Sequence, residues 1–257
     1  MMDAKLQELI KKSGNNLHAE VAQLLENLGW EVDISSYYHD DTTDKPREVD
    51  IVASKQIIVS SPGIGEGGFR VFLFIECKYF KEGVAFRMYN NNPRDSSSAI
   101  IFHGMSEDIL NESNTNLKKT HHYIRVPLIA KLYDGKENNE IFNSITGAVK
   151  SLVFFRERRN EKGLYYPMVV YSGVGGLYPI ENNNLTNLES VEPLKNLVFG
   201  LNYSYRSAVN SRLNTQYFCV DFVNKGELGD FLEMIEKQEI GELNGFARFL
   251  LLKGRRL

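Results

Sequence analysis

Two ionisable residues interrupt one face of a very apolar segment, residues 71–80. Successive side chains of a strand alternate between its faces, so Glu76 and Lys78 are expected on the same face as Phe72, Phe74 and Phe80. Burying a charge is costly unless it is paired or binds a metal. The segment therefore indicates either a cross-face ion pair near the strand end or a functional site.

A third ionisable residue lies on the preceding apolar segment, residues 47–53. The alternation predicts that Asp50 and Val52 face away from the apolar side chains of Val49, Ile51 and Ala53. If this strand forms a hairpin with the next, Asp50 lies beside Glu76, and two adjacent carboxylates repel unless a cation bridges them. Carboxylate oxygens are ligands of divalent cations. Without that pairing, Asp50 marks a strand edge or a turn.

Glu20 is the fourth residue of interest. It follows Leu17 by three residues and precedes Leu24 by four, so it stands at the margin of an apolar helical stripe. One interpretation is a boundary glutamate that reaches solvent. The other is that Glu20 supplies a further carboxylate to a cation site with Asp50 and Glu76.

The elements that position these residues can be read from periodicity and from turn residues. A helix is predicted over residues 17–28, ending at Gly29. Two strands, 48–59 and 69–80, are joined by the Gly-rich turn 62–68 and predict a hairpin. The other expected elements are helices at 3–12, 117–133, 138–157, 226–239 and 245–256, strands at 30–34, 165–171, 177–180 and 216–223, an irregular segment at 90–116 and an ambiguous one at 185–212. This order predicts a layered α/β or α+β fold with a mixed sheet.

Composition limits the class of protein. The 257 residues are 42% apolar and 25% charged, as in globular proteins, and the length favours a single domain. No apolar run reaches the roughly 18 residues of a membrane span. The start of the chain, residues 1–12, carries charges where a signal peptide is apolar. Two cysteines fit a reducing compartment. We therefore expect a soluble cytoplasmic protein with no membrane partner.

A formal net charge of −3 gives no overall basic field, so nucleic-acid binding would need local patches. Three basic clusters are candidates, although each alone could be a solvated face: 118–119, 156–159 and 255–256. His121 and His122 are adjacent on an expected helix and so point in different directions. We interpret them as a surface or substrate-facing feature.

Taken together, the candidate residues resemble a known family. Glu20 on an N-terminal helix, Asp50 on one strand and the triplet Glu76-Cys77-Lys78 on the next apolar strand are similar to the PD-(D/E)xK nuclease superfamily, which includes restriction endonucleases and Holliday-junction resolvases. The resemblance is strongest over residues 15–80. Val49 stands where the motif has its proline, and no Gln or Lys can be assigned on the helix that follows the motif strand.

The resemblance implies a single restriction endonuclease-like domain over residues 1–257. Its expected class is α/β, with an αβββαβ core, a mixed central sheet flanked by helices, and additional C-terminal strands and helices. It implies that Asp50, Glu76 and the backbone carbonyl of Cys77 bind Mg²⁺ or Mn²⁺, with Glu20 as a direct or water-mediated ligand. Lys78 would orient or deprotonate the attacking water.

The implied function is that of a metal-dependent endonuclease that hydrolyses DNA phosphodiester bonds, in defence against foreign DNA or in repair. A homodimer would allow it to cut two strands, although no sequence feature encodes one. The competing hypothesis is a non-catalytic nucleic-acid-binding or interaction module that retains the nuclease fold. A third is a metal-free globular protein in which these residues only form ion pairs.

Overall fold

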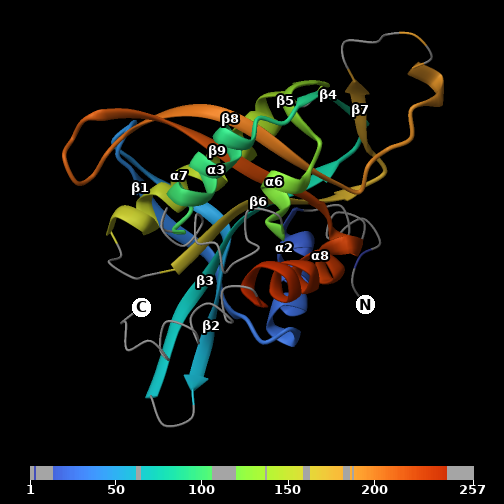
Figure 1. Cartoon of the computed structure of the whole chain (residues 1–257). Helices are drawn as coiled ribbons and strands as arrows, with labels where there is room; N and C mark the ends of the chain where they lie inside the picture. The colour runs from blue at the N-terminus through green and yellow to red at the C-terminus, as the bar shows by residue number, and fades with distance from the viewer. Residues whose placement is uncertain are drawn as a thin grey trace.

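A nine-stranded mixed sheet forms the centre of the computed structural model (Figure 1), which describes residues 3, 14–61, 65–105, 120–136, 138–158, 163–181, 186 and 188–241. The strand order is β1-β2-β3-β6-β9-β8-β5-β4-β7. The strands are β1 (Glu31–Asp40), β2 (Lys45–Ser61), β3 (Gly65–Phe80), β4 (Val84–Asn90), β5 (Leu128–Asp134), β6 (Gly163–Gly173), β7 (Leu177–Glu181), β8 (Asn196–Arg206) and β9 (Leu213–Asn224). The α/β class and the mixed sheet are thereby confirmed.

Helices cover the sheet on both faces. They are α2 (Gly14–Asn27), α3 (Pro93–Phe102), α6 (His122–Arg125), α7 (Asn138–Arg158) and α8 (Leu228–Met234), with the 3₁₀ turns η1 (Leu188–Ser190) and η2 (Lys225–Glu227) and the π-helix η3 (Ile235–Ile240). None of the described helices combines the length and the apolar character needed to cross a membrane.

The two faces of β3 contribute to different hydrophobic clusters. Val71 and Ile75 pack in a cluster that also contains residues of α2, α6 and α8, whereas Phe72 and Phe74 pack in a second cluster with α7. In Figure 1, α2 and α8 accordingly lie on the same side of the sheet. The alternation predicted for residues 71–80 is therefore confirmed.

The helix expected at 17–28 is confirmed as α2. Leu17, Val21 and Leu25 are all buried, at the i, i+4 and i+8 positions of one helical stripe. The helix ends before Gly29, whose φ of +80° lies in the left-handed region that glycine adopts without strain. This end turns the chain directly into β1.

The predicted hairpin is also confirmed. β2 and β3 are antiparallel, and Ile51 is paired with Ile75 in a ladder that runs to the distal end of both strands. Beyond Ile51 the next residues along the two strands are Asp50 and Glu76. The register therefore brings these two carboxylates to the same end of the hairpin, as the sequence predicts.

Two sequence expectations about the middle of the chain are wrong. The segment expected to be irregular, 90–116, contains α3, where Asn92 caps the helix and Pro93 occupies its first turn. The helix expected at 117–133 is only the short α6 among its described residues, followed by β5, because Pro127 holds Val126 in an extended conformation. The segment at 185–212, which the sequence leaves ambiguous, contains the whole of β8.

Several expected elements agree with the structure in type and approximate position. They are the helices at 138–157 and 226–239, although the second ends as a π-helix, and the strands at 165–171, 177–180 and 216–223. The strand expected at 30–34 extends to Asp40. The expected helices at 3–12 and 245–256 lie outside the described residues.

Candidate functional site

An open cavity of about 460 Å³ lies at the end of the β2–β3 hairpin, between α2 and α7. Its walls include Asp50 and Glu48 from β2, the triplet Glu76, Cys77 and Lys78 from β3, His18 from α2, and Glu140, Asn143, Gly147 and Lys150 from α7. Three of the four sequence-predicted side chains therefore reach one cavity.

Asp50 lies where β2 and β3 separate, at the end of the hairpin opposite its turn. Its Oδ2 atom accepts a hydrogen bond of 2.7 Å from the backbone N–H of Cys77, and it lies 3.2 Å from Nε2 of His18. A carboxylate thus satisfies a backbone donor at the end of the ladder. The other oxygen of Asp50 is not used by either contact.

The strand alternation that the sequence predicts is broken at Asp50. Val49 packs in the same cluster as Val52, not with Ile51 and Ala53 as expected. Across the strand pair, Ser35 of β1 has a φ of +57°, and the β1–β2 ladder omits the pair that it would make with Asp50. A local twist at this position, together with the side-chain bond of Asp50 to Cys77, explains the difference.

Glu76 lies against the backbone of α7. A Cβ atom placed on Gly147 would approach Oε1 of Glu76 to 2.4 Å, so only glycine leaves room for this carboxylate. Burial raises the pKa of Glu76 well above its usual value, and the negative charge of Asp50 raises it further, while Lys78 partly opposes both. The site therefore holds two carboxylates whose charges destabilise each other.

We expect Gly147→Ala to weaken metal binding without destabilising the fold. Alanine is favoured over glycine inside a helix by up to about 1 kcal/mol, but its methyl group would displace the carboxylate of Glu76. Gly229→Ala in α8, where an added Cβ has no neighbour within 4 Å, is the matched control. Thermal melting with and without Mn²⁺ should show a smaller metal-induced shift for the first variant only; equal shifts would show that Glu76 does not depend on this glycine.

Lys78 is paired across the cavity. Its Nζ atom lies 2.5 Å from Oε2 of Glu140, in the first turn of α7. The hydrogen bond from Lys78 lowers the pKa of Glu140 below its usual value. An exposed carboxylate thus holds the amine at the cavity. An anionic ligand bound there would compete with Glu140 for this amine.

Glu20 is not brought to this cluster. Its carboxylate accepts a hydrogen bond of 2.8 Å from Asn16 and pairs with Lys225, and it is absent from the cavity wall. Residues two apart on a helix point about 200° apart, so His18 faces the cavity while Glu20 faces away. The sequence predicts the carboxylate of Glu20 at the site, whereas the side chain of α2 that reaches it is the imidazole of His18, two residues earlier.

A polar stripe on α7 is the second feature that sequence reasoning missed. Glu140, Asn143, Gly147 and Lys150 line the cavity at intervals of three or four residues, which is one face of a helix. This spacing is the sequence pattern from which the polar stripe could have been predicted. The stripe ends in Lys150, so a lysine reaches the cavity from a helix that follows β3 along the chain.

Lys150 is fixed by the buried Asp40 at the end of β1, with 2.8 Å between Nζ and Oδ2. Burial alone would raise the pKa of Asp40, but hydrogen bonds from Lys150 and Thr43 bring it below its usual value. Arg47, which also lines the cavity, approaches the same oxygen to 3.8 Å. Asp40 therefore positions two cations at the cavity wall.

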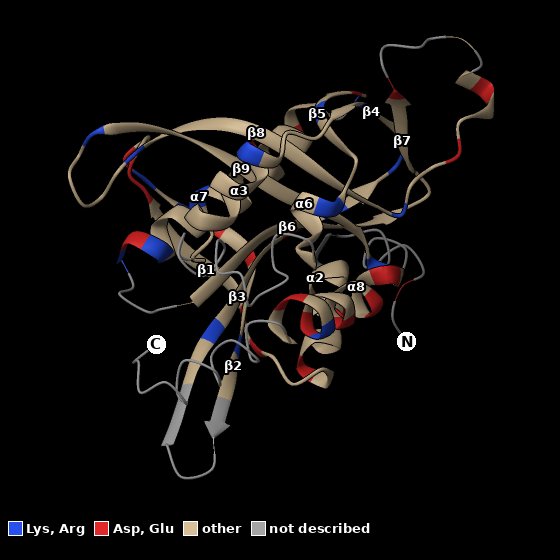
Figure 2. Ribbon diagram, viewed as in Figure 1, with Lys and Arg blue, Asp and Glu red and all other residues tan. Residues whose placement is uncertain are grey.

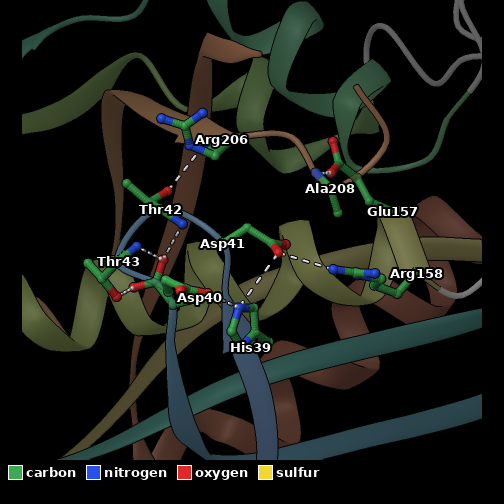
Figure 3. A network of polar contacts seen from close by, with 10 residues as sticks. His39, Asp40, Asp41, Thr42, Thr43, Glu157, Arg158, Arg206 and Ala208 are labelled. Atoms are coloured by element: carbon green, nitrogen blue, oxygen red, sulfur yellow. Dashed lines mark hydrogen bonds and ion pairs between the residues drawn. The ribbon is translucent and has the colours of Figure 1, made fainter. Parts of the chain in front are cut away.

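Figure 3 shows how the β1–β2 turn around Asp40 is braced. Asp40 accepts a hydrogen bond from the backbone N–H of Thr42, Thr42 Oγ1 accepts one of 3.1 Å from the backbone of Arg206, and Arg158 pairs with Asp41 at 3.1 Å. The turn is thus joined to the β8–β9 hairpin and to the end of α7.

The expected basic cluster at 156–159 does not form one patch. The guanidinium of Arg156 stacks on Phe102 at 4.0 Å, whereas Arg158 pairs with Asp41. Arg159 and the clusters at 118–119 and 255–256 lie outside the described residues. In the view of Figure 2, Lys and Arg are scattered over the fold, in keeping with the absence of an overall basic field.

The expectation for His121 and His122 is wrong: both are buried, and their rings stack at 5.1 Å between centroids. Nδ1 of His122 lies 2.6 Å from Glu239 of η3, and Nε2 lies 2.9 Å from Asp221 of β9. The two carboxylates outweigh the effect of burial and raise the pKa of His122 to about 10. Local periodicity could not predict that His122 pairs with two carboxylates from distant segments of the chain.

Among the residues that the structure describes, two groups of side chains have ligand atoms that all lie within 4.8 Å of one another: His18, Asp50 and Cys77 at the cavity, and His121, His122 and Glu239 in the core. In the second group both ring nitrogens of His122 already face carboxylates, and Nδ1 of His121 accepts from the backbone of Tyr123. The core group is therefore a hydrogen-bonded ion cluster, and the cavity group is the better candidate for a metal.

Comparison with known proteins adds no assignment: no family model matches the chain, and no curated protein or solved structure shows significant similarity to it.

Proposed function

We propose that the protein is a metal-dependent nuclease that hydrolyses phosphodiester bonds of DNA. The observation that carries the proposal is the meeting of Asp50 and Glu76 at the separated ends of two paired strands, in an open cavity that Lys78 also lines. Two neighbouring carboxylates beside a lysine, one of them buried, are a costly arrangement for folding alone.

The order of the sheet supports a restriction endonuclease-like core. α2, β1, β2 and β3 follow one another along the chain, and the strand beside β3 is β6, which is parallel to it and directly follows α7. This is an αβββαβ arrangement in which β4, α3, α6 and β5 are inserted before the second helix. The segment from β7 to η3 then adds the strands β7, β8 and β9 to the sheet and the helices α8 and η3 to the layer that covers it.

The donor set fits a hard divalent cation. Asp50, Glu76 and the backbone carbonyl of Cys77 would hold Mg²⁺ or Mn²⁺ through oxygen. Burial and the negative charge of Asp50 raise the pKa of Glu76, and a bound cation would favour its ionised form. Such a cation, when bound, neutralises the phosphate and lowers the pKa of bound water.

The chain's own cations would act on the substrate. Lys78, released from Glu140, would donate to the phosphate oxygens or to the attacking water, and Lys150 and Arg47 would bind the backbone next to the scissile group. Glu140 and Asp40 hold these cations in place before substrate arrives.

The test is incubation of the purified protein with linear, supercoiled and single-stranded DNA in Mg²⁺, in Mn²⁺ and with a chelator. The proposal expects cleavage that requires the cation. Absence of cleavage under all metal conditions, with binding retained, would support the second candidate, a non-catalytic nucleic-acid-binding module. The observation favouring that candidate is the ion pair that withdraws the Lys78 amine toward Glu140.

A further prediction concerns affinity. Arg47→Gln should weaken DNA binding and reduce the slope of log affinity against log salt by about 1, the loss of one phosphate contact. Lys136→Gln, an exposed lysine paired with Glu82 and absent from the cavity wall, is the matched control. Binding titrations at several salt concentrations measure both; an unchanged slope for Arg47→Gln would place the DNA elsewhere.

A further inference from the structure

A second donor set overlaps the proposed oxygen site. Nitrogen of His18 from α2, a carboxylate oxygen of Asp50 from β2 and the sulfur of Cys77 from β3 all lie within 4.8 Å of one another. Three elements converge to bring them together, and all three residues line the same open cavity. Cys77 thus presents two different ligands, its carbonyl oxygen and its thiol.

The chemistry of this set differs from that of the oxygen site. Imidazole and thiolate are ligands of Zn²⁺, which is bound by His nitrogen, Cys sulfur and carboxylate oxygen together, whereas Mg²⁺ prefers oxygen. Three protein ligands with an open fourth position are typical of accessible zinc sites. Here the cavity itself leaves that fourth position open.

We propose that His18, Asp50 and the Cys77 thiol bind Zn²⁺, and that this cation excludes Mg²⁺ because both donor sets need Asp50. Binding releases the thiol proton to solvent. The protein is then a nuclease that free zinc inhibits. The inhibition rests on the proposed function, but the binding of zinc does not.

Cobalt(II) absorption spectroscopy tests the binding, because a thiolate bound to Co²⁺ gives a charge-transfer band in the near ultraviolet. Purified wild-type protein with Co²⁺ should show this band, and added Zn²⁺ should remove it. The chain has only two cysteines, and Cys219 is buried in the core away from the cavity wall. Cys219→Ala is therefore the matched control and should keep the band.

Cys77→Ser should lose the band and bind Zn²⁺ at least about tenfold more weakly in calorimetric titration, since even changes outside the first ligands of a metal cost about 10–100-fold. His18→Gln, on a partly exposed helix position, should weaken Zn²⁺ to a similar degree, and it serves if Cys77→Ser fails to fold. No band in wild type, or a band unaffected by Cys77→Ser, overturns the proposal. The core cluster has no thiol, so zinc bound there gives calorimetric heat without a cobalt band.

Cleavage assays separate this inference from the proposed function. If Mg²⁺-dependent cleavage is found, Zn²⁺ should inhibit wild type, and inhibition of Cys77→Ser, relative to its own Mg²⁺ rate, should need at least about ten times more Zn²⁺. Cleavage that zinc does not inhibit refutes the inference alone. A cobalt band without any cleavage supports the zinc site and refutes the nuclease.

Discussion

His122→Gln is expected to lower the free energy of unfolding by about 3–5 kcal/mol at neutral pH, because it removes the positive charge from two buried carboxylates. Asp221 and Glu239 are 1% and 0% exposed, so solvent cannot take over the role of the imidazolium. Glutamine can still donate a hydrogen bond to one of them but leaves both charges uncompensated. Denaturant unfolding followed by circular dichroism measures the loss.

The pH dependence gives this prediction a second test. The folded-state pKa of His122 is raised from 6.5 to about 10, so its contribution to stability is complete below pH 6.5 and is lost as the pH rises toward 10. Wild type should therefore lose stability between about pH 6.5 and 9, and His122→Gln should lack this decline. At lower pH, His121, whose pKa is lowered to about 4, acts in the opposite direction.

His39→Gln is the matched control, because His39 is partly exposed and its ring contacts Asp41 and Asp44 of the β1–β2 turn. We expect a change within about 0.5 kcal/mol for it. A similarly small change in the free energy of unfolding for His122→Gln would mean that the buried cluster of His122, Asp221 and Glu239 is uncharged, with its protons bound to different atoms.

Asp50→Asn is expected to abolish the metal-induced rise in melting temperature and to slow DNA cleavage by at least about 100-fold, as does removal of one group that stabilises developing charge. The asparagine oxygen can still accept the hydrogen bond from the backbone of Cys77, so the strand ends keep their geometry. Because a negative charge beside Glu76 is lost, the metal-free variant should be at least as stable as wild type.

Thermal melting with and without millimolar Mn²⁺ checks the first part, and the cleavage assay checks the second. A cation that binds only the folded state stabilises it by about 2.7 kcal/mol at a hundredfold excess over its Kd. Asp44→Asn, an exposed aspartate in the β1–β2 turn, is the control and should behave as wild type. Equal melting curves for wild type with and without metal would contradict the cation site itself.

The features that could be predicted from the sequence are those that depend on local patterns. The α2 stripe ended by Gly29, the register of the β2–β3 hairpin and the shared face of Glu76 with Phe72 follow from periodicities of 3.6 and 2. The antiparallel pairing of the two strands brings Asp50 and Glu76 to one cavity, although the alternation of β2 is broken at Asp50 itself.

The remainder depends on contacts between distant segments. Glu20 is predicted as a metal ligand because it is a carboxylate. The packing of α2, however, turns His18 to the cavity and pairs Glu20 with Lys225. The Asp221–His122–Glu239 cluster joins residues about a hundred positions apart, and no local pattern encodes it. The sequence does not predict β4 and β5, because these two strands pair with each other within an insertion. The place of this insertion in the sheet is set by its neighbours β7 and β8.

The position of β6 has a consequence for synthesis of the chain. β3 receives its second neighbour only when β6 is complete, about 90 residues after β3 itself ends. At roughly 5–20 residues per second, the ribosome needs about 5–20 s to supply it. For that time the apolar edge around Phe72 and Ile75 can pair with another nascent chain. We therefore expect the yield of soluble protein to depend on chaperones and on slow expression more than its final stability suggests.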